Sequence, residues 1–230
     1  MSKWMAIAIG NSRIRVAAFD GRNILNQWQG LPTELEQRPP WTDNWQWEPQ
    51  QVVIASVGPQ GVTPWHSAPN FKVVTLGDVP LTGLYPGMGI DRALVALGAG
   101  VTLGFPVLAI DGGTAISITA VGGDRRLLGG MILPGLGLQV QSLHQGTAAL
   151  PRVTLPAAVP HLWAQDTQGA IQSGIIHTIR AGIIHIIEKW QSQLPGATVC
   201  LTGGDGAMLS RWGVPGIVEP DALWLGIAEI

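Results

Sequence analysis

Short runs of apolar residues, bounded by glycine, asparagine or aspartate, recur along the chain and predict strands. In the first half of the sequence these runs cover residues 4–9, 13–19, 24–28, 52–57 and 71–76. In the second half they cover residues 107–110, 115–121, 127–133 and 199–202. The runs at 52–57, 71–76 and 199–202 contain few polar positions, which indicates buried strands.

Three further stretches predict helices, at residues 91–103, 136–150 and about 167–193. In the first and the third, apolar residues recur three and four positions apart, the spacing of an amphipathic helix. The third helix is expected to begin after an N-cap at Asp166 or Thr167. Its buried stripe is expected to contain Ile171, Ile175, Ile179, Ile183, Ile186 and Trp190. Strands that alternate with such helices predict an α/β chain.

Residues 31–50 fit neither pattern, because they are rich in proline, glutamine and tryptophan and have no clear period. This composition predicts an irregular excursion over the surface. Its tryptophans, Trp41, Trp45 and Trp47, are expected to cover a groove or a partner surface.

The opening of the chain recurs near its midpoint, which indicates an internal repeat. Residues 7–12 form an apolar run and a glycine loop, followed by a strand and a turn at 20–21, and residues 110–115 open the same series. The offset between the copies is 111 − 8 = 103 residues. The repeat predicts two related α/β halves, residues 1–106 and 107–230, with a ligand cleft between them.

The composition is poor in charge. Charged residues make up 12% of the chain, about half of the usual fraction, and the formal net charge is −2. Because so little of the surface is charged, we expect part of it to be buried in an oligomer. The sequence contains no run of basic or acidic residues, so neither nucleic acid nor an anionic membrane is expected as a partner.

The chain is expected to be cytoplasmic. Its N-terminus leads straight into a strand-like pattern with no signal-peptide segment, and its single cysteine, Cys200, permits no internal disulfide. Cys200 lies in an apolar run and is expected to be a buried thiol. Residues 93–110 are uncharged, but Pro106 and three glycines interrupt them, which indicates a helix and then a strand and no membrane span.

Three glycine loops follow apolar strands, at residues 10–12, 112–114 and 203–204. Glycine lets the backbone turn and bring its N–H groups close to phosphate oxygens. Two such loops at matching places of a repeat, with a third, predict a nucleotide site. The sequence has neither a Walker loop nor a G-x-G-x-x-G dinucleotide motif.

Two aspartates are candidates for chemistry. Asp111 ends a strand that is expected to be central and buried, where a carboxylate needs a cation or several donors. It therefore either ligates a metal beside phosphates or caps its loop. Asp91 opens a helix, where it either stabilises the helix N-terminus or takes a hydroxyl proton during phosphoryl transfer. Arg92 beside it is suited to hold an anionic substrate, and the spacing alone does not decide between the two roles of Asp91.

Taken in order and spacing, the motifs resemble the type III pantothenate kinases, members of the actin-like kinase and Hsp70 superfamily. The resemblance covers nearly the whole chain. Its main segments are residues 9–13 (IGNSR), 89–92 (GIDR), 111–115 (DGGTA), 129–135 (GGMILPG) and 202–204 (TGG). Shorter matches occur at Leu150-Pro151, at Thr167, at Ala170-Ile171 and at Ser173-Gly174.

The resemblance implies a fold of two actin-like (ribonuclease H-like) halves with mixed central sheets, and a homodimer that phosphorylates pantothenate with ATP and Mg²⁺ on the way to coenzyme A. It implies a monovalent cation, K⁺ or NH₄⁺, bound by Asp111, and Asp91 as the catalytic base. The implied ATP contacts are Ala8, Ile9, Gly10, Asn11, Ser12, Arg13, Ile14, Arg15 and Thr114. The implied pantothenate contacts are Tyr85, Gly89, Ile90, Asp91 and Arg92, with Thr167 contributed by the neighbouring subunit.

One position departs from the family pattern. The family usually carries an acidic residue, which helps to hold magnesium, where this chain has Ala8. The repeat shows the same difference from within the sequence, because Asp111 in the second copy corresponds to Ala8 in the first. Two other classes of function remain open: a binding or regulatory protein that has kept the fold without the chemistry, and an actin-like kinase for another small molecule such as a sugar.

Overall fold

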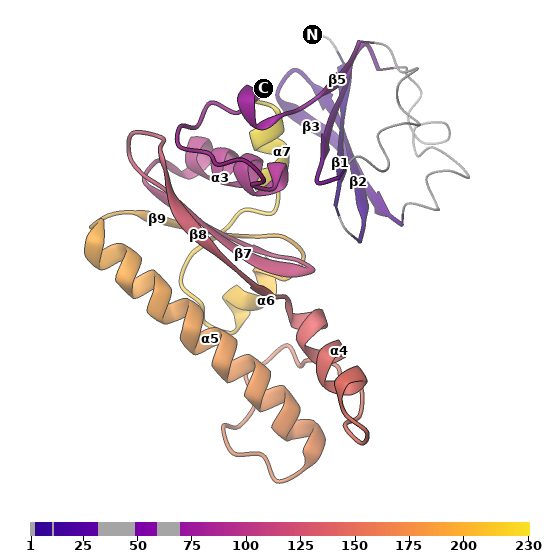
Figure 1. The fold of residues 1–230 in the computed structure, drawn as a ribbon, viewed down its shortest axis with the longest axis vertical. Helices are drawn as coiled ribbons and strands as arrows, with labels where there is room; N and C mark the ends of the chain where they lie inside the picture. The colour runs from indigo at the N-terminus through magenta and orange to yellow at the C-terminus, as the bar shows by residue number, and fades with distance from the viewer. Residues whose placement is uncertain (1–2, 11, 32–48, 59–69) are drawn as a thin grey trace. The chain divides into compact units, whose positions relative to one another are not determined.

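The computed structural model describes residues 3–10, 12–31, 49–58 and 70–230 of the chain (Figure 1). Asn11, Trp41, Trp45 and Trp47 therefore lie outside the described residues, and with them most of the expected excursion at 31–50. The chain forms two compact units, Met1–Thr102 with Asp221–Ile230, and Leu103–Pro220. The division expected from the repeat put the last ten residues in the second half, whereas in the structure they belong to the first unit.

The first unit is built on a five-stranded mixed sheet with the order β3-β2-β1-β4-β5. Its strands are β1 (Lys3–Ile9), β2 (Ile14–Asp20), β3 (Asn23–Gly30), β4 (Val52–Ser56) and β5 (Phe71–Val73). The first three are antiparallel, and β4 and β5 add in parallel beside β1. One face of the sheet packs in a core formed by Met5, Ile7, Ile9, Ile14, Val16, Ala18, Val52 and Ile54.

The C-terminal segment returns to the first unit through a contact between two helices, α3 (Ile90–Leu103) and α7 (Ala222–Ile227). A Cβ atom at Gly98 of α3 would collide with the backbone of Ala222, and one at Gly226 of α7 would collide with the carbonyl of Leu94. The two glycines thus let the helix backbones touch, which no side chain would permit. This contact explains why a short, separate segment completes the first unit.

The second unit repeats the topology of the first, with the order β10-β9-β6-β7-β8. Its strands are β6 (Val107–Gly112), β7 (Ala115–Val121), β8 (Leu127–Pro134), β9 (Thr198–Thr202) and β10 (Ile217–Val218). Strands β6, β7 and β8 are antiparallel, and β9 and β10 add in parallel beside β6. Every pairing of the first sheet therefore has its counterpart in the second, and the predicted mixed sheets are confirmed.

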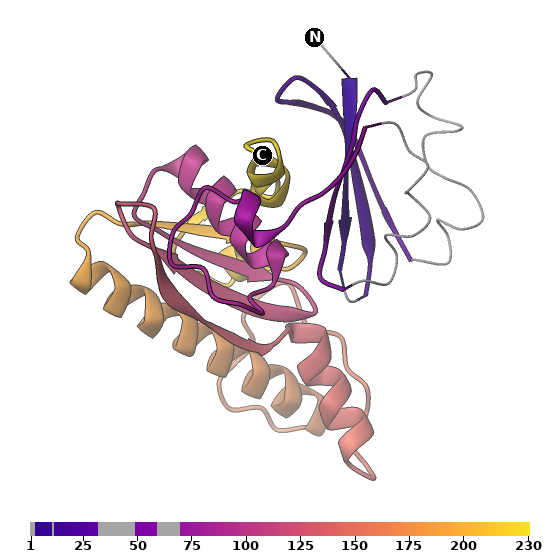
Figure 2. The ribbon, with the colours of Figure 1, turned by 45° about the horizontal axis from the view of Figure 1, so that its top comes forward.

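Three helices accompany the second sheet, α4 (Leu136–Gly146), α5 (Thr167–Gln193) and α6 (Gly206–Arg211), and α5 runs along one face of it (Figure 2). Asp166 is the N-cap of α5, as predicted, and its side chain accepts a hydrogen bond of 2.8 Å from the Gly169 N–H. The predicted stripe is buried except at Ile186, which is only partly buried. Its neighbour Ile187 is buried in its place. By length and composition α5 could cross a membrane, but its buried stripe is that of a core helix.

Several predicted boundaries were wrong for local reasons. The strand expected at 71–76 ends at Val73, because Asp78 accepts hydrogen bonds from the N–H and hydroxyl of Thr75 and starts the 3-10 helix η2 (Leu76–Asp78). Gly112, expected in the glycine loop at 112–114, continues β6 and pairs with Ile116 of β7. Helix α4 stops at Gly146, four residues early, since Thr147 adopts an extended conformation.

Candidate active site

The strand registers place Ala8 and Asp111 at equivalent positions. Ala8 in β1 pairs with Arg15 across the antiparallel β1–β2 ladder, and Asp111 in β6 pairs with Ser117 across the β6–β7 ladder. The side chains before them, Ile7 and Ile110, each enter the core of their own unit, so the two positions also share a face. The difference between the copies that the repeat predicted is therefore present in the fold.

The parallel neighbours extend this match. Ala8 lies beside Ala55 of β4, and Asp111 lies beside Thr202 of β9. Asp111 is thus flanked on both sides by hydroxyl residues, Ser117 and Thr202, and both of these side chains are buried. This group presents only oxygen atoms, which is the ligand type that hard cations prefer.

The third glycine loop packs against Asp111. Gly203 has a φ of +77°, and a Cβ atom there would collide with Oδ1 of Asp111 and lie 2.5 Å from the carbonyl oxygen of Gly112. The Asp205 N–H donates a hydrogen bond of 2.9 Å to the same carbonyl. Burial raises the pKa of the Asp205 carboxyl. The predicted glycine loops at 112–114 and 203–204 therefore pack against each other in the second unit.

Thr114 lies exposed at the tip of the β6–β7 hairpin. Its carbonyl accepts a hydrogen bond of 3.0 Å from the N–H of Gly135, which directly precedes α4. A Cβ atom at Gly135 would collide with the carbonyl of Gly113 and lie 2.5 Å from that of Thr114. Gly135, at the junction between β8 and α4, therefore packs closely against the hairpin tip and holds it in place.

The β1–β2 hairpin of the first unit is a tight turn, in which the Gly10 N–H donates to the Arg13 carbonyl at 3.0 Å. Ser12 and Arg13 are exposed, whereas Ile9 and Ile14 are buried in the core. The two isoleucines can therefore reach a ligand only through their backbone. No acidic side chain lies in the described part of this hairpin, residues 8–10 and 12–15.

The chain enters α3 through a type II turn. The Met88 N–H donates to the Tyr85 carbonyl at 3.1 Å, Pro86 takes the second position and Gly87, with a φ of +84°, the third. The Gly89 carbonyl then accepts the first helical hydrogen bond, from the Ala93 N–H at 3.3 Å. This turn sets Tyr85 beside the first turn of the helix.

Four of the predicted substrate residues form one cluster at that helix start. Oδ1 of Asp91 accepts a hydrogen bond of 2.8 Å from the Arg92 N–H, and a Cβ atom at Gly89 would lie 2.5 Å from the same oxygen. Arg92 is only 8% exposed, and its Nη1 donates to the hydroxyl of Tyr85 at 2.9 Å. Within the part of the first unit that the structure describes, the other oxygen of Asp91 accepts no hydrogen bond.

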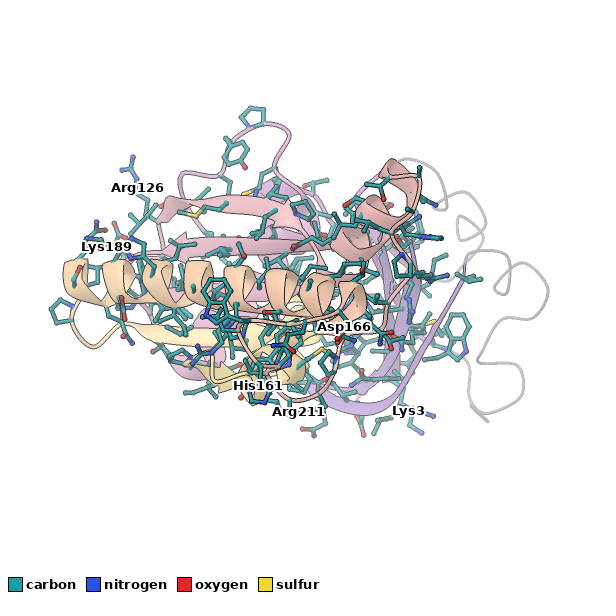
Figure 3. All side chains as sticks on the ribbon, turned by 90° about the horizontal axis from the view of Figure 1, so that it is seen from below. Lys3, Arg126, His161, Asp166, Lys189 and Arg211 are labelled. Carbon is teal, nitrogen blue, oxygen red and sulfur yellow. The ribbon has the colours of Figure 1, made fainter. Side chains whose placement is uncertain are left out.

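Arg92 provides the part of this cluster that favours an anion. A guanidinium in the first turn of a helix lies near the positive end of the helix dipole, so both attract negative charge. Ile90 is buried and contributes to the helix core instead. Thr167 belongs to the second unit, where it is exposed in the first turn of α5 next to Asp166, which marks that end of the helix in Figure 3.

The described residues include no group of three or more histidine, cysteine, aspartate or glutamate side chains suited to hold a metal. Burial raises the pKa of Cys200 to about 12, so this residue is the inert strand thiol that was predicted. Sequence reasoning missed Ser117, Thr202 and Asp205 as neighbours of Asp111. The strand period could have indicated the two hydroxyl residues, because both lie on the Asp111 face.

Comparisons with known proteins bear on both units. Residues 4–189 match the family model described as type III pantothenate kinase. A type III pantothenate kinase from Gloeobacter violaceus is 41% identical over 209 residues, which cover 91% of this chain and 89% of the relative. Another from a Nostoc species is 37% identical over 265 residues, which cover 100% of this chain and 94% of the relative.

Solved structures show the same fold at low identity. A protein assigned to the Baf family of transcriptional activators, from Campylobacter jejuni, has a TM-score of 0.70 at 19% identity, with 98% of this chain and 96% of that one covered. A protein from Sinorhizobium meliloti, assigned as a 2-dehydro-3-deoxygalactonokinase, has a TM-score of 0.60 at 12% identity, with 98% and 95% covered. These likenesses agree with the actin-like arrangement of each unit.

Proposed function

The chain belongs to the type III pantothenate kinase family, and on this premise we propose which of its residues carry out the transfer of phosphate from ATP to pantothenate. Phosphorylation of pantothenate is the reaction of this kinase, on the way to coenzyme A. The observation that supports the assignment best is the cluster of Tyr85, Gly89, Asp91 and Arg92 at the start of α3.

Asp91 is the general base. During transfer, the hydroxyl oxygen of pantothenate forms a bond to the γ-phosphorus while the bond from that phosphorus to the leaving ADP oxygen breaks. The hydroxyl proton passes to the oxygen of Asp91 that does not accept from the Arg92 N–H. The hydrogen bond at the other oxygen holds the carboxylate in place, and the absence of a side chain at Gly89 gives it room.

Arg92 holds the carboxylate of pantothenate. Its charge is fixed near the helix N-terminus by burial and by the hydrogen bond to Tyr85, so little reorganisation is needed when the anion binds. Tyr85 is exposed and contacts the same substrate. Gly89 and Ile90 complete the pantothenate contacts through the backbone that leads into α3.

ATP is contacted by residues 8–15 of the first unit and by Thr114 of the second. The hairpin backbones approach the phosphates, and Ser12, Arg13 and Thr114 offer exposed polar side chains. A divalent metal, Mg²⁺, supplies charge neutralisation on the phosphates when bound, and the described residues of the first hairpin give it no carboxylate. Without a carboxylate from this hairpin, the metal would be held there by phosphate oxygens and water.

Asp111 binds a monovalent cation, K⁺ or NH₄⁺. The carboxylate lies at the centre of the second sheet between two buried hydroxyl residues, Ser117 and Thr202, and these oxygen atoms fit such an ion. Its location beside the hairpin tip at Thr114 connects the cation with the nucleotide contacts of the same unit.

The active enzyme is a cytoplasmic homodimer in which Thr167 contacts pantothenate bound by the partner. The low charged fraction, 12% of the chain, and the exposed position of Thr167 at the start of α5 support this proposal. Light scattering tests it, because a stable monomer at micromolar concentration would contradict it.

The reaction itself is tested with a panel of acceptors. Purified protein is given ATP, Mg²⁺ and K⁺ with pantothenate or with common sugars, and ADP release is followed. Phosphorylation of pantothenate that depends on K⁺ supports the whole assignment. Turnover of a sugar in place of pantothenate, or of no acceptor at all, would contradict it.

A further inference from the structure

The first unit contains a hollow beside the strand end at which Ala8 lies. Its volume is about 310 Å³, and its lining residues are Arg15, Gln27, Trp28, Gln29 and Trp224. Arg15 pairs with Ala8 on one side and with Gln29 of β3 on the other. Since neighbouring strands lie roughly 4.8 Å apart, the hollow begins one strand away from the position that lacks a carboxylate.

The described lining of this hollow offers donors and no carboxylate. The guanidinium of Arg15 brings five N–H groups in a planar fork, and Gln29 adds an amide. Within the described residues of the first unit, the Arg15 side chain forms no hydrogen bond and no ion pair. Its donors are therefore available to a ligand.

Hydrogen bonds hold one wall of the hollow in place. The side-chain oxygen of Gln27 accepts a hydrogen bond of 3.0 Å from the indole of Trp224, and its nitrogen donates at 2.7 Å to Asp221. Trp224 is buried, and its indole is the apolar part of this wall, whereas the Trp28 side chain packs against the core on the other face of the sheet. Apolar walls next to a cation lower the local dielectric constant and strengthen its attraction for an anion.

The pair of residues at the end of the first strand carries a positive charge in the first unit and a negative charge in the second. In the second unit the pair is Asp111 and Ser117, an acid beside a neutral hydroxyl, whereas in the first it is Ala8 and Arg15, a neutral residue beside a base. Equivalent places in the two sheets thus carry opposite charge. The second suits a cation, and the first suits an anion.

We propose that the hollow is a phosphate-binding site, in which Arg15 supplies positive charge that a metal ion held by a carboxylate at position 8 would otherwise bring. The inference rests on the proposed nucleotide contacts of residues 8–15 and deepens them. A guanidinium binds two phosphate oxygens through parallel hydrogen bonds, which a single amide cannot reproduce. The phosphate belongs either to the bound nucleotide or to free inorganic phosphates.

The test is calorimetric titration of the full chain with ATP in the presence of a chelator, without metal or pantothenate. Wild type is expected to bind, and Arg15→Gln to bind about tenfold to a hundredfold more weakly, the usual effect of losing a charge-assisted hydrogen bond. Arg15→Lys keeps the charge without the fork and should fall between the two. The matched control is Arg126→Gln, an exposed arginine before β8 that loses the same charge and should bind as wild type does.

Inorganic triphosphate separates the two sources of phosphate. If triphosphate binds the wild type and binds Arg15→Gln more weakly, the phosphate chain alone is the ligand. If only ATP loses affinity in Arg15→Gln, the phosphate must be carried by a nucleotide. Equal affinity of wild type, Arg15→Gln and Arg15→Lys for metal-free ATP would overturn the proposal. A failure to phosphorylate pantothenate would contradict the proposed function alone, since these titrations contain neither pantothenate nor metal.

Discussion

The hydroxyl of Tyr85 accepts a hydrogen bond of 2.9 Å from Nη1 of Arg92, across the turn that leads into α3. This bond joins an exposed aromatic residue to a buried guanidinium and fixes the direction in which the guanidinium donates. The orientation of Arg92, and with it the binding of an anionic substrate, therefore depends on a residue outside the helix.

Replacing Tyr85 by phenylalanine keeps the ring and removes the acceptor. We expect Tyr85→Phe to raise the KM for pantothenate about threefold to tenfold, because a hydrogen bond to a charged group contributes about 1.5–3 kcal/mol and water can replace part of it at an exposed site. The kcat should change less than the KM, since the proton transfer does not involve Tyr85. Steady-state kinetics measure both, and a large fall in kcat at unchanged KM would contradict this role.

A second prediction concerns the contact between α3 and α7. Gly226→Ala places a methyl group against the backbone at Leu94, and overpacking of this kind costs about 1–3 kcal/mol. We expect a lower Tm, measured by circular dichroism. The control is Gly182→Ala in α5, where a Cβ atom meets nothing within 4 Å, and this change should be neutral or raise the Tm because alanine favours helix. An unchanged Tm in Gly226→Ala would show that the return of α7 does not stabilise the first unit.

Asp111→Asn tests the cation site. The substitution removes the charge while keeping an oxygen ligand, so we expect activity to require a higher K⁺ concentration, by tenfold or more. The measurement is the K⁺ concentration for half-maximal turnover. If Asp111→Asn shows the K⁺ dependence of the wild type, Asp111 only supports its loop.

Ala8→Asp tests the missing carboxylate. Magnesium at nucleotides is held by phosphates, waters and only one or two carboxylates, so a chain without this carboxylate should still bind ATP but need more magnesium for turnover. We expect Ala8→Asp to lower the Mg²⁺ concentration for half-maximal turnover. An unchanged requirement, or a loss of activity, would mean that another group already performs this role.

The sequence predicted the repeat and the equivalence of Ala8 and Asp111, because strand period and glycine loops are local patterns that survive in each copy. It also predicted the Asp166 cap, since capping needs only neighbouring residues. It missed the return of α7 to the first unit, which depends on the approach of Gly98 to Gly226, more than a hundred residues apart. No local pattern encodes such a contact.

The candidate site divides in the same way. Asp111 stood out because a carboxylate at a buried strand end needs a cation or several donors. Asp91 stood out because Arg92 follows it at a predicted helix start, although an acid there also stabilises the helix. The role of Thr202 depends on the register between β6 and β9, which are distant in sequence, and that register became visible only in the folded sheet. Ser117 is only six residues from Asp111, but their pairing depends on the register of the β6–β7 hairpin. The pair of Ala8 and Arg15 likewise depends on the register of a hairpin, β1–β2.

The central claim is that Asp91 is the base, and kinetics of Asp91→Asn test it most directly. The control is Asp124→Asn, in a turn where the side chain likewise accepts a hydrogen bond from a nearby backbone N–H, that of Arg126. We predict that Asp91→Asn keeps the wild-type Tm and loses about 10²–10⁴-fold in kcat, while Asp124→Asn stays fully active. A kcat close to that of wild type in Asp91→Asn would contradict the account and leave Asp91 as a helix-stabilising acid.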